Sequence, residues 1–193
     1  EEVDEVIKVA VNAKEKWRET PINERAKILY RAADILQERI VDLSDILIRE
    51  VAKDRKSAES EINRTADFIR FTADTSKSIY GESIQSDSFP GFDKKKLSVV
   101  VREPMGVVLA ISPFNYPINL SASKIAPALV AGNTVVLKPA TKGSLSGLYL
   151  AKIFQEAGIP DGVLNTVTGR GSEIGDYIVT HPSIDFINFT GSS

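Results

Sequence analysis

The first half of the chain carries its apolar side chains at helical spacing. Apolar residues recur at positions 3, 6, 7, 10, 11 and 17, which predicts one amphipathic helix over residues 1–18. Thr20 then offers an N-cap hydroxyl and Pro21 a first-turn residue for a long second helix, whose apolar stripe runs from Ile22 to Val51. A third helix is expected from about Lys56 to Tyr80. The chain is therefore expected to begin with a helical segment.

The pattern changes after the third helix. Gly81 suits the position just beyond a helix end, and the serine, aspartate, proline and glycine content of residues 82–93 indicates a loop. Leu97 to Val101 is a short β-branched run, which predicts a strand that ends in a turn at Glu103 and Pro104. These features place a boundary between the helical segment and the rest of the chain.

The second half alternates strand-like and helical segments. The apolar runs are Val107 to Ile111, Thr134 to Leu137, Val163 to Val167 and Ile184 to Phe189. Helical spacing recurs near residues 118–131, 144–157 and 172–180, and Gly132 and Gly158 supply helix stops. Uninterrupted apolar strands are expected when helices cover both faces of a parallel sheet. We therefore expect an α/β fold with a doubly wound parallel sheet, preceded by a helical segment, with its ligand site at the carboxyl ends of the strands.

Composition and charge exclude several classes of protein. With 42% apolar and 26% charged residues among 193, the composition is that of a globular protein, not of a disordered or fibrous one. The net charge of −2, with acidic and basic residues interspersed, argues against nucleic acid as a partner. The longest apolar run, Val107 to Ile111, is too short to span a membrane, and the acidic first helix does not resemble a signal peptide. We therefore expect a cytoplasmic protein without membrane contact.

Cysteine and histidine limit the available chemistry. The chain has no cysteine, which excludes disulfides, thiolate metal sites and a thiol nucleophile among its own residues. Its single histidine leaves no histidine-based triad or metal cluster. No metal site is therefore expected.

Small, polar or rigid residues follow all the strands predicted in the second half. These turns are Ser-Pro-Phe-Asn-Tyr-Pro at 112–117, Lys-Pro-Ala-Thr at 138–141, Thr-Gly-Arg-Gly-Ser at 168–172 and Thr-Gly-Ser-Ser at 190–193. Every α/β domain needs turn residues at its strand ends, so each turn alone is explained by local structure. Because the carboxyl ends of parallel strands meet at one edge of the sheet, the turns together favour a ligand site.

Three features of these turns have both a functional and a structural interpretation. The Asn115 amide, held between two aromatic residues before Pro117, can stabilise an oxyanion or cap the following helix. Lys138 can meet a ribose or a phosphate, or can simply be solvated. Residues 169–175 are similar to a dinucleotide fingerprint, but they have one residue too many before the last glycine and follow the third strand. A turn for close helix–strand packing is the alternative there.

Three segments, taken in order, resemble the aldehyde dehydrogenase superfamily. They are SPFNYPINLSASKIAPALVAGNTVVLKPA at 112–140, GIPDGVLNTVTG at 158–169 and FINFTGSS at 186–193. The resemblance covers essentially the whole chain. Within the superfamily, the segments NYPIN, GRGSEIGDYIV and EVAKDRKSAESEINRTADFI are most similar to the NADP-dependent, non-phosphorylating glyceraldehyde-3-phosphate dehydrogenases.

The resemblance implies an activity for the intact protein. An oxidoreductase is expected that oxidises glyceraldehyde 3-phosphate to 3-phosphoglycerate with NADP through a cysteine thioester. The family's cysteine nucleophile and glutamate base lie downstream of this sequence, so an N-terminal fragment of such an enzyme is expected. Two alternatives stay open: a dehydrogenase for lactaldehyde, succinate semialdehyde or another small aldehyde, and a non-catalytic nucleotide-binding module.

The resemblance also implies which residues meet the adenosine and nicotinamide ends of the cofactor. Ser112 and Phe114 match positions whose backbone lines the nicotinamide ribose, and Lys138 matches a lysine that binds the adenosine ribose. Thr141 stands where many NAD-preferring relatives have a glutamate, which repels a 2′-phosphate. Because no carboxylate is present at this position, NADP is expected as the cofactor, with NAD as the other possibility.

Two further places are implied in cofactor binding. Gly191 and Ser192 match the turn whose backbone N–H groups meet the pyrophosphate. Asp176, on the helix that flanks the adenine, is another candidate, although an exposed helical aspartate usually belongs to a solvated face. The cofactor is thus expected to reach the ends of several strands.

Catalytic and substrate residues follow from the same resemblance. Asn115 matches the family's oxyanion asparagine and is the expected catalytic residue within this chain. Arg64 matches an arginine that faces the substrate phosphate, and Tyr116 can contact the same small aldehyde. The structural alternative for Arg64 is a surface residue paired with Glu61 or Asp67.

The expected domain organisation has three parts. Residues 1–95 form helices that pack on the cofactor domain, and residues 96–104 belong to the strands through which family members oligomerise. Residues 105–193 form a truncated dinucleotide-binding α/β domain. A homo-oligomer, either a dimer or a tetramer, is therefore implied for the intact protein.

Overall fold

A computed structural model describes residues 1–88, 90–91 and 95–191 of the chain. Helices come first, namely α1 (Glu2–Glu19), α2 (Ile22–Glu38), α3 (Ile40–Val51) and α4 (Arg55–Ser76). A hairpin of β1 (Glu82–Gln85) and β2 (Leu97–Val100) follows, with the short 3-10 helix η1 (Ser86–Ser88) after β1. The α/β part contains β3 (Val107–Ile111), α5 (Pro117–Val130), β4 (Thr134–Lys138), η2 (Thr141–Gly143), α6 (Ser144–Glu156), β5 (Leu164–Thr166), α7 (Gly171–Val179) and β6 (Phe186–Phe189). None of the helices in these ranges combines the length and the apolar character needed to cross a membrane.

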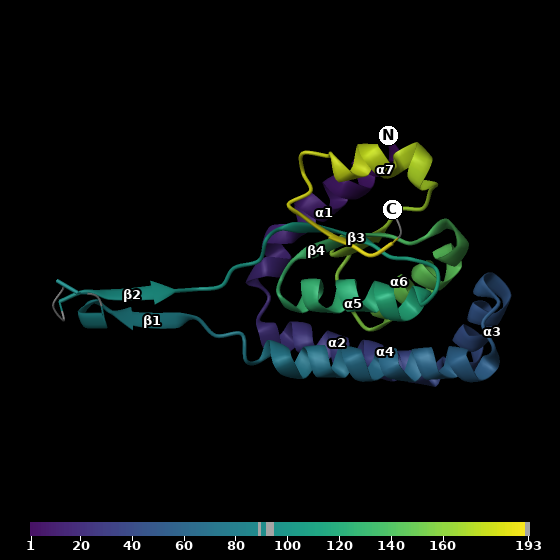
Figure 1. The fold of residues 1–193 in the computed structure, drawn as a ribbon, viewed down its shortest axis with the longest axis horizontal. Coiled ribbons are helices and arrows are strands. Elements are labelled where there is room, and N and C mark those ends of the chain that lie inside the picture. Colours follow the sequence, from purple (N-terminus) through teal and green to yellow (C-terminus); the bar gives the residue numbers. More distant parts are fainter. Residues whose placement is uncertain (89, 92–94, 192–193) are drawn as a thin grey trace.

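Strands β3 to β6 form a parallel sheet in the order β5-β4-β3-β6. Alternate residues of β3 face opposite layers. Val107 and Leu109 pack with residues of α1 and α7, whereas Val108 and Ala110 share the larger core with α5 and α6. Figure 1 shows α1 and α7 on one side of the sheet, α5 and α6 on the other, and α2 and α4 as a further layer beyond α5. The predicted fold class, a doubly wound parallel sheet preceded by a helical segment, is thus confirmed.

The glycine stops predicted for the crossover helices are also confirmed. Gly132 follows α5 with φ +93° and Gly158 follows α6 with φ +99°. Residues other than glycine rarely adopt this backbone region. Each glycine reverses the chain toward the next strand. The two helices therefore start at the carboxyl end of one strand and end near the amino end of the next.

The helical segment departs from the prediction at its corners. The single helix expected from Ile22 to Val51 is two helices, because the chain turns at Arg39 (φ −94°, ψ 18°) between α2 and α3. The apolar stripe continues in phase across this corner, so its spacing gave no sign of the break. Thr20 does not cap α2, because it ends α1 and its hydroxyl donates to the Lys16 carbonyl oxygen (3.1 Å).

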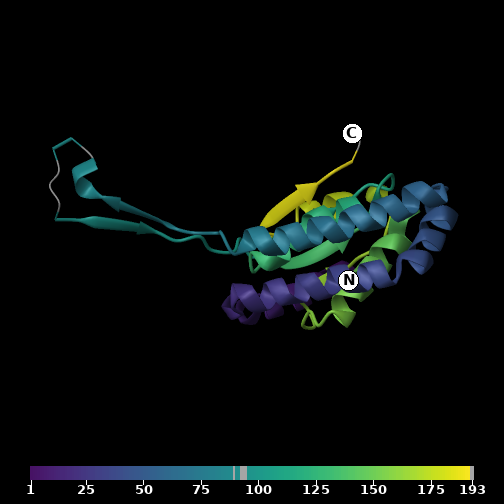
Figure 2. The same cartoon turned by 90° about the horizontal axis from the view of Figure 1, so that it is seen from below.

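The hairpin of β1 and β2 projects away from the other elements (Figures 1 and 2). β2 agrees with the predicted strand, but β1 lies in the segment predicted to be a loop, and α4 ends at Ser76, before the predicted Tyr80. β1 pairs antiparallel with β2, with Glu82 opposite Val100. Gly81 is not a helix cap; a Cβ there would lie 2.1 Å from the Val100 carbonyl oxygen, so the two backbones approach closely. The sequence Glu-Ser-Ile-Gln has one apolar residue and so carries no strand pattern of its own. The pairing with β2 is what identifies this segment as a strand.

Polar side chains fix the helical segment to the α/β part. Trp17 Nε1 donates to the Leu129 carbonyl oxygen (3.0 Å), and Arg25 Nε donates to the Val130 carbonyl oxygen (2.9 Å). These acceptors are among the last carbonyl groups of α5, which have no partner within the helix itself. α1 and α2 therefore hold the carboxyl end of α5, while Leu36, on α2, contributes to the same core.

Candidate functional site

The turn after β3 is held rigidly at its first residue. Ser112 is buried, and its hydroxyl oxygen lies 2.7 Å from that of Ser121, which itself donates to the Pro117 carbonyl oxygen (2.6 Å). The Ser112 hydroxyl is thus already used inside the protein. The Ser112 N–H also donates to the Lys138 carbonyl oxygen (3.3 Å), which ties the end of β3 to the end of β4.

Asn115 is exposed at the mouth of this turn. Its Oδ1 accepts a hydrogen bond from the Tyr116 N–H (3.1 Å). Within the described part of the chain, no acceptor takes a hydrogen bond from its Nδ2, so this amide group can donate outward. The alternative that Asn115 caps α5 is wrong, because Tyr116 is the N-cap residue and the α5 N–H groups find another acceptor.

That acceptor is Glu61 of α4, a fully buried carboxylate. Its Oε1 accepts from the backbone N–H groups of Ile118 and Asn119, each at 3.0 Å, and its Oε2 accepts from Lys53 Nζ. A carboxylate at the start of a helix satisfies unpaired N–H groups and interacts favourably with the helix dipole. α5 is therefore capped by a residue that lies far away in the sequence.

Lys53 extends this contact to the turn itself. Its Nζ donates to the Asn115 carbonyl oxygen (2.9 Å) and lies 3.8 Å from the centroid of the Tyr116 ring. Its side chain is 11% exposed and that of Glu61 is 0% exposed, so the pair is largely shielded from water. Sequence patterns alone did not single out either residue. One signal was available, because Glu61 lies on the buried stripe of α4 next to Ile62.

The turn after β4 is built in a similar way. Lys138 is 6% exposed, and burial lowers its pKa below the ordinary value. No carboxylate of the described residues pairs with its ammonium group. Glu50 of α3 accepts from the N–H groups of Leu145 (2.7 Å) and Ser146 (2.9 Å) at the start of α6, and Thr141 is exposed in η2 just before that helix. α6, like α5, is thus capped by a carboxylate from the helical segment.

The turns after β3 and β4 lie side by side. A Cβ added to Gly143 would come within 3.0 Å of the Pro117 Cβ and 3.5 Å of the Phe114 Cα. Phe114 is itself 52% exposed. The structure therefore brings the Asn115 turn and the Thr141 turn to one edge of the sheet.

The turns after β5 and β6 have no such caps among the described residues. Gly191 directly follows Thr190, whose N–H donates to the Ile111 carbonyl oxygen (3.1 Å), so the end of β6 lies beside the end of β3. Ser192 lies outside the described residues. Lys124 of α5 donates to the Thr190 hydroxyl (2.6 Å), and burial lowers the pKa of this lysine.

Residues 169 and 170 lead into α7, and residues 171–175 form its start. A Cβ at Gly169 would lie 2.7 Å from Ile174 Cδ1, which agrees with the close-packing interpretation of this turn. Asp176 is exposed on α7, and among the described contacts its side chain has none with the turns after β3 and β4. The structure thus leaves Asp176 outside the group formed by Ser112, Asn115 and Lys138.

Arg64 lies on α4, one helical turn after Glu61, and is exposed. The pairing alternative for Arg64 is wrong, because Glu61 pairs with Lys53 and Asp67 pairs with Arg70 (3.6 Å). The neighbouring Thr65 hydroxyl accepts from Asn119 Nδ2 (3.2 Å). Arg64 therefore lies next to the contact between α4 and the start of α5. Its guanidinium has no carboxylate partner in the described ranges.

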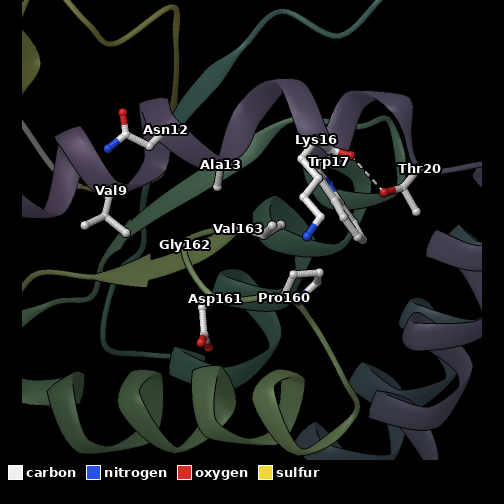
Figure 3. Close-up of a pocket in the computed structure, with 10 residues that line it drawn as sticks. All are labelled: Val9, Asn12, Ala13, Lys16, Trp17, Thr20, Pro160, Asp161, Gly162 and Val163. Carbon is white, nitrogen blue, oxygen red and sulfur yellow. Dashed lines mark hydrogen bonds between the residues drawn. The ribbon is translucent and has the colours of Figure 1, made fainter.

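A separate hollow lies between α1 and the loop before β5 (Figure 3). Lys16 and Trp17 of α1 face Pro160 and Val163 across it. Val163 immediately precedes β5, so the hollow lies at the amino ends of the strands. Ligand sites of doubly wound sheets lie at the opposite, carboxyl ends. The hollow is therefore not part of the candidate site.

The fold and the paired strand-end turns agree with the family that the sequence resembles. The chain belongs to the aldehyde dehydrogenase family, whose sequence profile matches residues 1–193. The resemblance inferred from the sequence is thereby confirmed.

Particular members of the family are similar over the whole chain. The NADP-dependent glyceraldehyde-3-phosphate dehydrogenase of Streptococcus equinus is 54% identical over 193 residues, which are 100% of this chain and 40% of that protein. The enzyme of the same name from Nicotiana plumbaginifolia is 46% identical, over 99% of this chain and 39% of its own length. The crystal structure of NADP-dependent glyceraldehyde-3-phosphate dehydrogenase from Bacillus halodurans C-125 complexed with NADP has a TM-score of 0.96 and 54% identity, and covers 98% of this chain and 40% of that one. The chain thus spans about 40% of the length of these relatives.

Proposed function

We propose that this chain is the cofactor-binding part of an NADP-dependent, non-phosphorylating glyceraldehyde-3-phosphate dehydrogenase, and that it supplies the oxyanion amide. One observation carries the proposal: two adjacent strand-end turns hold Asn115, whose Nδ2 has no acceptor among the described residues, and the buried Lys138, which has no carboxylate partner among them. The similarity to enzymes of that name supports the same choice. In this proposal residues 1–95 support the cofactor domain, which spans residues 105–193.

The residues at the end of β4 fit NADP. The Lys138 ammonium is buried and has no carboxylate partner in the described part of the chain, so an anionic ligand would offset its desolvation. Thr141 offers a hydroxyl and no negative charge near a 2′-phosphate. We therefore assign Lys138 and Thr141 to the phosphorylated ribose, with NAD as the alternative cofactor.

The helix starts at this edge limit where the pyrophosphate can bind. Helix N-termini bind phosphates through their unpaired N–H groups. Glu61 and Glu50 already occupy the N-termini of α5 and α6. α7 also starts without a side-chain cap, but the resemblance to the family favours the turn at Gly191 and Ser192, after β6, which we assign to the pyrophosphate. Asp176 stays a candidate for the adenine end.

The chemistry assigned to this chain is the stabilisation of negative charge. A thiolate from outside the chain, which has no cysteine, adds to the aldehyde carbon and leaves an oxyanion. The Asn115 Nδ2 donates to that oxygen. Bound NADP would supply the acceptor for the hydride that leaves the same carbon. Ser112 and Phe114 line the nicotinamide ribose through their backbone, because the Ser112 hydroxyl is already bonded to Ser121.

Arg64 and Tyr116 are assigned to the substrate. The Arg64 guanidinium is exposed and has no carboxylate partner among the described residues, and a planar guanidinium matches a phosphate dianion. Tyr116 is 43% exposed beside Asn115. A phosphate at one end of the aldehyde and the oxyanion at the other would then be held from α4 and from the turn after β3.

The hairpin is assigned to assembly. Large apolar side chains are exposed along β2 and just after it, at Leu97 (64%), Val99 (65%), Val100 (46%) and Val101 (69%). An exposed apolar strand of this kind is a template for pairing with another chain. We infer a homo-oligomer for the intact protein, joined through residues 96–104.

The activity test uses the full-length protein that contains this chain. It is supplied with glyceraldehyde 3-phosphate and NADP in the absence of inorganic phosphate, and NADPH is followed by absorbance. NADPH formation is expected, and its absence would reject the substrate. The Arg64→Leu variant separates the alternatives: its kcat/KM should fall for glyceraldehyde 3-phosphate and stay constant for lactaldehyde, which carries no phosphate.

A further inference from the structure

The buried pair of Lys53 and Glu61 has no part in the chemistry assigned above. Both residues come from the helical segment, yet their contacts lie on the turn that carries Asn115 and on the start of α5. Glu61 accepts from the N–H groups of Ile118 and Asn119 (3.0 Å each) and from Lys53 Nζ. Lys53 in turn reaches the Asn115 carbonyl oxygen (2.9 Å).

These contacts fix the turn from two directions. The carbonyl group of Asn115 is held by Lys53 Nζ, and the next helical turn is held by Glu61. The side-chain Oδ1 of Asn115 is held by the Tyr116 N–H (3.1 Å), and the Tyr116 ring lies against Lys53 Nζ (3.8 Å to the ring centroid). The remaining polar group of the Asn115 side chain is Nδ2, which has no acceptor among the described residues and can donate outward.

Stability alone does not account for an ion pair at this place. The desolvation of two charges offsets most of their attraction, and apolar residues of similar volume often stabilise a fold equally well. An ion pair with further hydrogen bonds on both partners does specify one geometry. Glu61 has two backbone donors besides Lys53, and Lys53 has two contacts besides Glu61, so geometry is the property that the pair provides.

We infer that Lys53 and Glu61 are positioning residues, which orient the Asn115 amide and the Tyr116 ring for the oxyanion step. The inference rests on the proposed function for its kinetic consequence. Neither residue is expected to touch the aldehyde, since the contacts of both are with the protein.

The test is a double-mutant cycle in the full-length protein. Lys53→Met keeps the stem of the side chain and removes its charge, and we expect kcat to fall about 10- to 100-fold, because small displacements of catalytic groups cost rates of this size. KM for the aldehyde and for NADP should change much less. In the Asn115→Ala background the same substitution should lower kcat by less than about threefold, since its target is gone. Equal losses in both backgrounds would overturn the inference.

Two further variants separate charge loss from damage to the fold. Lys56→Met removes a lysine from the exposed start of α4 and should leave kcat unchanged. Lys53→Arg keeps the positive charge and should recover most of the lost kcat. A Lys53→Met protein with normal thermal unfolding but unchanged kcat would also contradict the inference.

Hydrogen exchange gives a result that does not depend on activity. In full-length Lys53→Met, the amides of residues 114–116, 118 and 119 should exchange faster than in Lys56→Met. The amides of Leu145 and Ser146, which Glu50 holds, should be unaffected. If the wild-type protein forms no NADPH, the proposed function fails. Unchanged exchange at the amides of residues 114–116, 118 and 119 would show independently that the pair does not hold the turn.

Discussion

The helices that follow β3 and β4 are capped from a distance, whereas the described turns that follow β5 and β6 are not. Glu61 and Glu50, from α4 and α3, accept hydrogen bonds from the first N–H groups of α5 and α6. α7 starts at Gly171, its N-cap residue Arg170 makes no side-chain cap, and Gly191 is exposed. Two helix dipoles at this edge of the sheet are thus neutralised by the protein itself.

This difference separates two tasks at one edge. A capped turn is rigid and its helix start cannot accept a second anion, so it suits groups that must be held in place, such as Asn115 and Lys138. An uncapped turn keeps its N–H groups available for an anionic ligand. The helical segment therefore shapes the candidate site mainly by holding its turns in place. The residue of this segment that we assign to the substrate is Arg64.

The largest expected effect comes from Asn115 on the capped turn after β3. Asn115→Ala in the full-length protein should lower kcat about 100- to 1000-fold, the usual loss for one oxyanion donor. Asn115 is exposed, so the thermal unfolding temperature should stay nearly constant. The control is Asn12→Ala, an exposed asparagine in the separate hollow beside α1. A loss of less than about threefold for Asn115→Ala would remove this residue from the chemistry.

The next effect distinguishes the two caps from each other. Glu50→Ala removes the acceptor for Leu145 and Ser146 and should lower the unfolding free energy by about 1–2 kcal/mol, as loss of a helix cap does. Because η2 and Thr141 precede that helix, KM for NADP should rise about three- to tenfold. Changes in kcat should be small, in contrast to Lys53→Met.

Glu50→Gln and Glu38→Ala serve as controls for this pair of measurements. The glutamine keeps an acceptor oxygen and should recover part of the stability, and Glu38 is exposed at the end of α2. If Glu50→Ala lowered kcat as strongly as Lys53→Met, the two caps would not have separate roles.

A third effect concerns cofactor choice at the turn after β4. Thr141→Glu places a carboxylate where the 2′-phosphate is assigned and should lower the NADP-to-NAD ratio of kcat/KM about tenfold, because like charges at close range repel by roughly 1–2 kcal/mol. Lys138 nearby offsets part of this repulsion. Thr75→Glu, on the exposed end of α4, should leave the ratio unchanged. An unchanged ratio for Thr141→Glu would place the 2′-phosphate elsewhere.

Local patterns predicted most of the fold and the position of the candidate site. The strands, the crossover helices and the stops at Gly132 and Gly158 follow from spacing within a few residues, and parallel topology then brings the strand-end turns together. The corner at Arg39 was missed because the apolar stripe stays in phase through it. β1 was missed because its hydrogen bonds come from β2.

The caps could not be predicted from local patterns. A local capping box places the acceptor three residues from the N–H group, whereas Glu61 and Ile118 are 57 positions apart and Glu50 and Leu145 are 95 apart. For the same reason, the sequence left both interpretations of Asn115 open, as an oxyanion donor or as the cap of α5. The residue that caps α5 is Glu61, which comes from α4. Only the three-dimensional packing of the two halves decides these contacts.

The smallest expected effect concerns Ala52, in the junction between α3 and α4. Glu50 and Lys53, on the two sides of Ala52, contact the start of α6 and the Asn115 turn. Ala52 separates Glu50 from Lys53 and has a left-handed backbone (φ 54°, ψ 35°), in which a Cβ costs roughly 1–2 kcal/mol. Ala52→Gly relieves this strain but adds about 0.4–1 kcal/mol of unfolded-state entropy, so the unfolding free energy should rise by only about 0.5 kcal/mol.

The same substitution in a regular helix should have the opposite sign. Ala151→Gly, inside α6, should lower the unfolding free energy by about 0.5–1 kcal/mol. Chemical denaturation of the full-length variants measures both values, and kcat reports whether the caps stay in place. Since glycine keeps the left-handed turn, Glu50 and Lys53 should still reach α6 and the Asn115 turn, and kcat should be unchanged. A fall in kcat for Ala52→Gly would mean that the stiffness of this junction, and not only the charges beside it, holds the turn after β3.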